Sequence, residues 1–116
     1  MQAFTYTTFG QSLPLPEFFY DKVQHFGAGG SCGILGCFIS ALIAGTQSNR
    51  RIIVLAILTA LTIGVLWEVI EHTWPALNGG THSYTSADTI ADIVLDCLGG
   101  LVAGFWYRIK NVTMLA

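Results

Sequence analysis

Residues 52–67 read IIVLAILTALTIGVLW, a run without a single charged side chain. The apolar character continues to about Trp74, and a comparable stretch lies on each side of this one along the chain. The three stretches cover about Lys22–Ala44, Ile52–Trp74 and Ser86–Tyr107. Each has about 22 residues, so as an α-helix each extends roughly 33 Å, which matches a hydrocarbon core of about 30 Å. The sequence therefore predicts an all-α membrane bundle of three transmembrane helices.

The composition supports a membrane protein and excludes several soluble classes. The 116 residues are 53% hydrophobic and only 10% charged, whereas an ordinary soluble domain has about 25% charged residues. A soluble chain of this length has too small an interior to bury so much apolar surface. Five Lys and Arg residues against seven Asp and Glu residues give no basic field, so nucleic acid is not an expected partner. We expect residues 1–116 to form a single membrane domain in contact with lipid.

The basic residues predict the orientation of the bundle. Four of them lie between the first two predicted helices or after the third, and so share one side: Arg50, Arg51, Arg108 and Lys110. Lys22 is the only other Lys or Arg and lies on the opposite side. The positive-inside rule then places the C-terminus in the cytoplasm and the N-terminus outside, in a bacterial inner membrane. Residues 1–20 contain neither Lys nor Arg, so no cleavable signal peptide is expected.

The ionisable side chains gather at the non-cytoplasmic end of the predicted bundle. All the acids and all the histidines map there: Glu17, Asp21, Glu68, Glu71, Asp88, Asp92, Asp96, His25, His72 and His82. Residues four apart lie about 40° apart around a helix and so share a face. Asp21 is paired in this way with His25, and Glu68 with His72, while three aspartates form a stripe on the third helix. The spacing therefore predicts one polar cluster that all three helices face.

Depth in the membrane makes this cluster a candidate metal site. Asp96 lies roughly 15 Å from either interface, where a lone charge costs several kcal/mol. Either several carboxyls keep their protons or a cation is bound, because Lys22 is the one fixed positive charge on that side. We expect a divalent metal ion, Zn²⁺ or Mn²⁺ ahead of Mg²⁺, because imidazole favours the first two. The expected ligands are His25, Glu68, His72 and Asp92. Glu71 and Asp96 are expected to orient the ligands or to act as general bases.

Some of these residues also have simpler explanations. Asp21 and Asp88 could be first-turn acids that the helix dipole favours, and Glu71 could be a solvated residue at the interface. The three cysteines fall inside the predicted spans, where small packing residues are the plain interpretation: Cys32, Cys37 and Cys97. A passive role is least expected for the residues that lie within a span: His25, Glu68, Asp92 and Asp96.

Three short motifs occur in order, one on each predicted helix. They are Asp21-Lys-Val-Gln-His-Phe26, Trp67-Glu-Val-Ile-Glu-His72 and the aspartate stripe that ends in Gly99-Gly100. Over about residues 20–106 these motifs make the chain resemble the VanZ-like and YjdF-like group of small bacterial inner-membrane proteins. The resemblance implies the membrane location and supports the site, but it implies no activity. Such proteins usually have four or more spans, which implies that another copy or a partner subunit replaces the missing helix.

Three functions compete at this point. The first is a metal-dependent site that faces the periplasm and acts on a lipid or envelope substrate. The chain has no phosphate-binding loop, Gly-x-Ser-x-Gly or His-Glu-x-x-His motif, so whether it is an enzyme stays open. The second is an accessory or assembly subunit, alone as a homo-oligomer or in a larger membrane complex, whose polar cluster fixes helix register. The third makes His25 and His72 axial ligands of a haem.

Overall fold

A computed structural model describes residues 17–44, 48–74 and 86–114 of the chain, and these residues form three helices. Helix α2 is Glu17–Ala44, α3 is Asn49–Thr73 and α4 is Ser86–Met114. Each contains a segment long and apolar enough to cross a membrane: Phe19–Ile43, Asn49–Thr73 and Ser86–Asn111. The predicted all-α bundle of three membrane helices is therefore confirmed.

The helices differ from the predicted spans mainly at their ends. Helix α2 begins at Glu17 and α4 continues to Met114, so both extend past the apolar segments. Helical hydrogen bonds do not require an apolar environment, and the polar residues that flank the spans simply continue the helix. Helix α3 ends at Thr73, and Trp74 has left the helical conformation. The next residue is Pro75, and proline disfavours the helical conformation of the residue before it.

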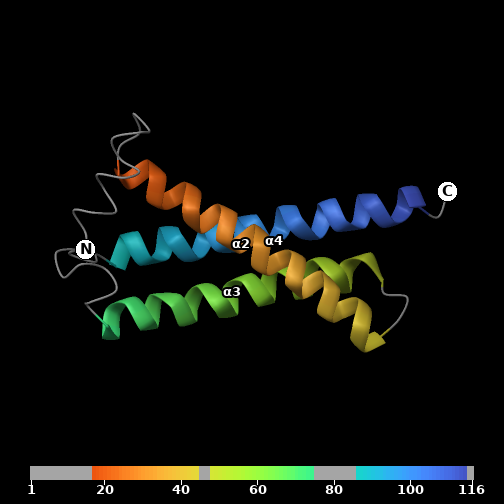
Figure 1. The fold of residues 1–116 in the computed structure, drawn as a ribbon, viewed down its shortest axis with the longest axis horizontal. Coiled ribbons are helices and arrows are strands. Elements are labelled where there is room, and N and C mark those ends of the chain that lie inside the picture. Colours follow the sequence, from red (N-terminus) through yellow and green to blue (C-terminus); the bar gives the residue numbers. More distant parts are fainter. Residues whose placement is uncertain (1–16, 45–47, 75–85, 115–116) are drawn as a thin grey trace.

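The three helices all contact one another in one bundle. Helix α3 and helix α4 run in opposite directions, and α2 crosses both of them (Figure 1). The crossing is close because small residues meet there: a Cβ atom added at Gly33 of α2 would lie only 2.7 Å from the Cα atom of Gly100 on α4. The buried apolar residues are also mostly small, and include Cys37, Ala56, Ala60 and Ala103. Small residues let membrane helices approach until their backbones touch.

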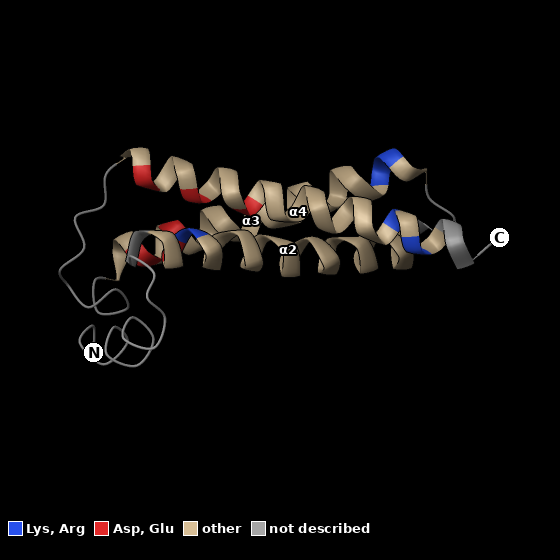
Figure 2. Cartoon of the chain, turned by 90° about the horizontal axis from the view of Figure 1, so that it is seen from above, with Lys and Arg blue, Asp and Glu red and all other residues tan. Residues whose placement is uncertain are grey.

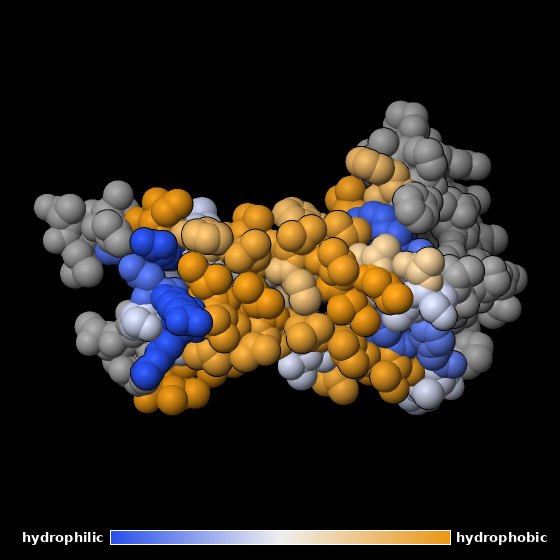
Figure 3. Space-filling view, turned by 180° about the vertical axis from the view of Figure 1, so that it is seen from behind, coloured by the Kyte–Doolittle hydropathy of each residue, from blue (hydrophilic) through white to orange (hydrophobic). Residues whose placement is uncertain are grey.

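The large apolar side chains face outward, as expected for a bundle in lipid. Leu42 is 86% exposed and Ile43 is 76% exposed. On the face shown in Figure 3, apolar surface covers the middle of the bundle and polar surface lies toward both ends. Acidic residues lie toward one end of the bundle and most basic residues toward the other (Figure 2). Several polar residues are buried instead, namely His25, Ser40, Glu68, Asp92 and Asp96, and all but Ser40 belong to the predicted cluster.

Candidate metal centre

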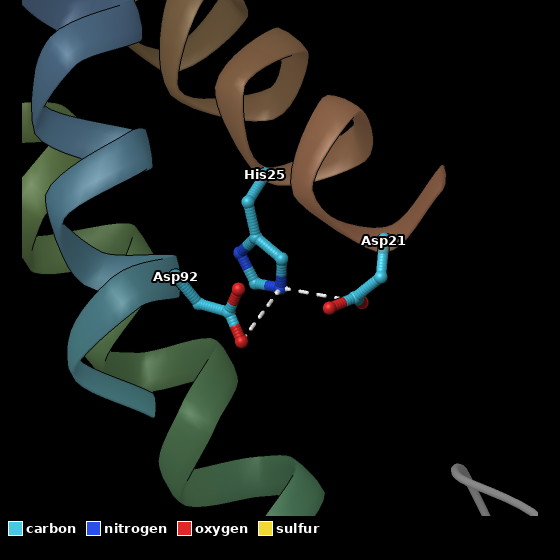
Figure 4. A group of neighbouring side chains, drawn as sticks. All are labelled: Asp21, His25 and Asp92. Carbon is cyan, nitrogen blue, oxygen red and sulfur yellow. Dashed lines mark ion pairs between the residues drawn. The ribbon is translucent and has the colours of Figure 1, made fainter. Parts of the chain in front are cut away.

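His25 lies at the centre of the buried polar cluster. It is only 9% exposed and lies between Asp21 of its own helix and Asp92 of α4 (Figure 4). Helix α2 brings Asp21 and His25 to one face because four residues make about one helical turn. Asp88, Asp92 and Asp96 are also four residues apart, so they lie along the face of α4 that packs against α2. The packing of α2 on α4 therefore encloses the imidazole in carboxylates.

The two nitrogens of the His25 imidazole have different surroundings. Nδ1 lies 3.3 Å from Oδ2 of Asp96, a carboxylate that is almost fully buried. When Nδ1 carries the proton it donates to Asp96, and Nε2 is then left with its lone pair. A carboxylate on one histidine nitrogen is the usual way in which proteins orient the other nitrogen toward a metal ion.

Three carboxylate oxygens from three helices surround Nε2 of His25. Oδ2 of Asp92 lies 3.7 Å from it, while Oδ1 of Asp21 and Oε1 of Glu68 each lie 3.9 Å from it. These distances exceed a hydrogen bond, and one nitrogen donates to only one acceptor well. A tetrahedral ion about 2.0–2.1 Å from each donor sets neighbouring donor atoms roughly 3.3 Å apart. Each of the three oxygens therefore lies only a few tenths of an ångström farther from Nε2 than one ligand of such an ion lies from another.

Three of these residues satisfy a direct geometric criterion for a metal site. Asp21, His25 and Asp92 each offer one ligand atom, and all three atoms lie within 4.8 Å of one another. Two of the three, His25 and Asp92, belong to the ligand set expected from the sequence. The third, Asp21, has the simpler explanation of a first-turn acid, and only its spacing from His25 pointed to the cluster.

The ammonium group of Lys22 lies within the cluster and bonds three aspartates. Its Nζ atom lies 2.8 Å from Oδ2 of Asp21, 2.7 Å from Oδ1 of Asp88 and 2.5 Å from Oδ1 of Asp92. The side chain is 11% exposed, so these charge-assisted bonds form largely away from water. Asp21 and Asp92 each give one oxygen to Lys22 and turn the other toward His25. Sequence reasoning counted this lysine as one charge and missed that it joins three aspartates.

Glu68 is buried, and its carboxylate makes no hydrogen bond of normal geometry within the described residues. It is 4% exposed, and neither carboxylate oxygen is hydrogen-bonded to any residue in the described part of the chain. A buried carboxyl in this condition is costly, because it has lost water without gaining a hydrogen bond from a described residue. Its nearest basic groups are the imidazoles of His25, at 3.9 Å, and of His72, at 4.0 Å. Glu68 could therefore act as a further donor beside His25.

His72 and Glu71 lie differently from these residues. Nδ1 of His72 lies 2.7 Å from the backbone oxygen of Glu68 and 4.0 Å from Oε2 of the same residue. The His72 side chain is 44% exposed, and it is not part of the group around His25. Glu71 lines a cavity of about 350 Å³ together with Asp21, His25 and Asp96. His82 lies outside the described residues.

A glycine on α3 makes room for Asp96. A Cβ atom added at Gly64 would overlap Oδ2 of Asp96, and one added at Gly29 of α2 would overlap the Asp96 backbone. Asp96 is therefore held between two helix backbones that lack side chains at the contact. Neither glycine was singled out for this role from the sequence, because nothing local distinguishes a glycine that packs on a carboxylate from one that packs on another helix.

The comparisons with known proteins agree with the membrane architecture. Neither the curated proteins nor the solved structures gave a match to this chain. A family model described as a predicted membrane protein matches residues 2–111, which is nearly the whole length. The chain therefore belongs to the DUF2238 family of predicted membrane proteins.

Proposed function

We propose that this protein binds a divalent metal ion at the outer end of its membrane bundle and uses it on a lipid or envelope substrate. The observation that carries the proposal is the set of three carboxylate oxygens 3.7–3.9 Å from Nε2 of His25. Donors contributed by three helices at one point are the arrangement found in metal sites of helical bundles. The proposed ligands are His25, Asp21, Asp92 and Glu68. His72, expected from the sequence to be a ligand, is left outside this set.

Charge favours the same proposal. Four carboxyls lie around one imidazole, namely those of Asp21, Glu68, Asp92 and Asp96. Lys22 supplies one positive charge, and its bonds use only the far oxygens of Asp21 and Asp92. A divalent ion would offset two further charges and would satisfy Glu68. The mixed imidazole and carboxylate donors favour Zn²⁺ or Mn²⁺ over Mg²⁺.

Two residues would serve a reaction at this site. A bound divalent ion supplies Lewis-acid activation of water or of a substrate oxygen. Glu71 lines the adjoining cavity and is the proposed general base. Asp96 would act through His25, because its bond to Nδ1 fixes the ring and keeps Nε2 available. Hydrolysis is the reaction class that these roles fit.

The location and orientation follow from the sequence rules given above. The basic residues at the end opposite the cluster favour a cytoplasmic C-terminus, which supports a site at the non-cytoplasmic surface. The resemblance to VanZ-like and YjdF-like proteins supports a bacterial inner membrane. It also supports an assembly in which a second copy or a partner subunit covers part of the bundle.

A structural accessory subunit is the second candidate. The observation that favours it is the bonding of Lys22 to Asp21, Asp88 and Asp92, which joins α2 to α4 without any metal ion. A polar network of this kind can fix the register of packed helices. Haem ligation has no comparable support, since both His25 nitrogens face carboxylates rather than an apolar slot for a porphyrin.

Two histidines provide a matched test of the metal site. Protein purified in detergent without chelator is expected to carry stoichiometric Zn or Mn by elemental analysis. Added Zn²⁺ at a hundred times its Kd should stabilise the metal-free protein by about 2.7 kcal/mol. His25→Ala should abolish both effects, and His72→Ala should preserve them. Absence of metal, together with an unchanged melting temperature, would leave the accessory role; a Soret band would favour haem.

A further inference from the structure

A cavity of about 350 Å³ adjoins the cluster on one side of the bundle. One wall comes from α2, the opposite wall from α3, and Asp96 of α4 contributes to the floor. The wall of α2 extends from Asp21 to Cys32, and that of α3 from Ala60 to Glu71. At about 1.5 Å per residue each wall is roughly 16 Å long. The cavity is thus an elongated slot that runs along the bundle and not a pit at its end.

The polarity of the lining changes along the slot. Asp21, Gln24 and His25 of α2 face Glu71 of α3 at the outer end. Farther into the span the lining residues other than Asp96 are small or apolar: Ala28, Cys32, Ala60, Ile63 and Gly64. A membrane amphiphile has the same gradient, since its polar head lies near the interface and its chain extends toward the middle of the bilayer.

The slot is open toward the surroundings of the bundle. Trp67 is 47% exposed and Ile63 is 37% exposed, and Gln24 and Ala28 on the facing helix are also exposed. All four line the cavity, so its rim belongs to the outer surface of the helices. In a membrane this surface faces lipid, and a lipid molecule could enter sideways without crossing the bundle.

The charges at the outer end select the head group. Three carboxyl residues line the slot: Asp21 and Glu71 toward its outer end, and Asp96 deeper, beside Gly64. None of the lining residues is Lys or Arg, and the nearby Lys22 bonds one oxygen of Asp21. The Trp67 ring lies in the same lining. Carboxylates beside an aromatic ring suit an organic ammonium group, which the acids attract by charge and the ring by its negative face.

We propose that this slot binds a membrane amphiphile with an ammonium head group. The head lies near Asp21, Glu71 and Trp67, and the apolar chain follows Ala28 and Ile63 into the bundle. The site shares Asp21 and His25 with the proposed metal site but does not depend on a bound ion. Binding to chelator-treated protein therefore tests it separately, and failure to find a metal would leave the lipid result standing.

The test uses Trp67 as the reporter in bilayers of known composition. A Trp74→Phe/Trp106→Phe variant retains Trp67 alone, and is placed in nanodiscs of equimolar ethanolamine and glycerol phospholipid after chelator treatment. Bromine atoms on the acyl chains of one lipid at a time quench a nearby indole. Bromine on the ethanolamine lipid should quench Trp67 more strongly, with a roughly two- to fivefold preference for this lipid at the site. Equal quenching, or stronger quenching by the glycerol lipid, would overturn the proposal.

Adjacent positions on α2 provide a matched control. A Cβ atom added at Gly27 meets nothing within 4 Å, whereas Ala28 lines the slot. Ala28→Leu should fill the slot and remove the preference, while Gly27→Leu should leave it unchanged. Glu71→Gln should reduce the preference without filling the slot, so the test does not depend on one variant folding. A preference that survives both Ala28→Leu and Glu71→Gln would place the bound lipid elsewhere.

Discussion

Gly64 of α3 leaves the space that the carboxylate of Asp96 on α4 occupies, since a Cβ atom at position 64 would overlap Oδ2 of Asp96. The contact fixes the depth of α4 against α3 at the level of the cluster. It also determines where His25 can find its partner, because the same Oδ2 lies 3.3 Å from Nδ1 of the imidazole. Oδ2 of Asp96 thus packs against Gly64 and also lies beside the imidazole of His25.

Gly64→Ala is therefore expected to destabilise the protein. The added methyl group must displace a buried carboxylate that is held from both sides, and overpacking of this kind costs about 1–3 kcal/mol. Thermal unfolding in detergent measures the loss. Gly27→Ala is the control, because its methyl group meets nothing within 4 Å and alanine favours a helix by up to about 1 kcal/mol over glycine. Equal stability of the two variants would contradict the proposed contact.

Lys22→Met should change stability and metal affinity in opposite directions. Removal of the ammonium group leaves Asp21, Asp88 and Asp92 without their shared cation, and loss of one partner of a buried ion pair costs about 3–5 kcal/mol. The same loss frees two carboxylates to bind a metal ion more tightly. Unfolding with and without added Zn²⁺ separates the effects. Lys110→Met, at the other end of the bundle, should leave the metal affinity unchanged. A parallel fall of stability and metal affinity in Lys22→Met would refute this role of Lys22.

Asp96→Asn should weaken metal binding without removing a ligand. The amide can still fill the space beside Gly64, but it no longer attracts the proton on Nδ1 of His25. Loss of such a partner reduces metal affinity by about 10- to 100-fold, which calorimetry with Zn²⁺ would measure. Asp88→Asn is the matched change on the same helix face. Asp88 bonds Lys22 and is not one of the proposed ligands, so its effect should be smaller. The idea fails if the two variants are equally affected.

Glu68→Gln should stabilise the metal-free protein and weaken metal binding. The carboxyl is buried with neither oxygen hydrogen-bonded among the described residues, and an amide of the same shape removes the charge that makes this burial costly. A metal ion would then lose one negatively charged donor. Without Zn²⁺ the variant should therefore melt at a higher temperature than the unchanged protein. With Zn²⁺ it should melt at a lower temperature than the unchanged protein. A metal-free variant that is less stable would show that Glu68 is satisfied in another way.

The orientation can be tested with two fusions after Ala116. A cytoplasmic C-terminus predicts that a green fluorescent protein fused there fluoresces and that an alkaline phosphatase fused there stays inactive. The reason is the excess of basic residues at that end of the bundle. An active phosphatase would reverse the topology, and the cluster would then face the cytoplasm.

The helices and the end that carries the cluster were predictable from the sequence. Apolar runs of sufficient length require helices in lipid, because the bilayer offers no other partner for backbone groups. The four-residue spacing of Asp92 and Asp96 also indicated a shared inward face, and both are buried. Local periodicity decides such features, and tertiary contacts only confirm the face that is turned inward.

The exact set of partners around His25 was not predictable in the same way. Glu68 and His72 share a nominal helix face, yet Glu68 is buried and His72 turns back to its own helix one turn farther out. Whether the final turn of a helix still faces its neighbours depends on crossing angles that the sequence does not state. The contacts of Lys22 were not predictable either, because its long flexible side chain reaches three aspartates on two helices.

The half of the bundle beyond the cluster has two helical segments without charged or histidine side chains, and this affects how an ion could cross the membrane. From Phe26 to Ala44 and from Ile52 to Trp67 the chain contains no Asp, Glu, Lys, Arg or His. There a Cβ atom added at Gly104 would lie 3.0 Å from the Cα atom of Ile53 on the neighbouring helix. A metal ion bound as proposed would therefore leave on the side from which it came. The proposed site would then hold a cation partway into the electric field without discharging the voltage that the membrane maintains.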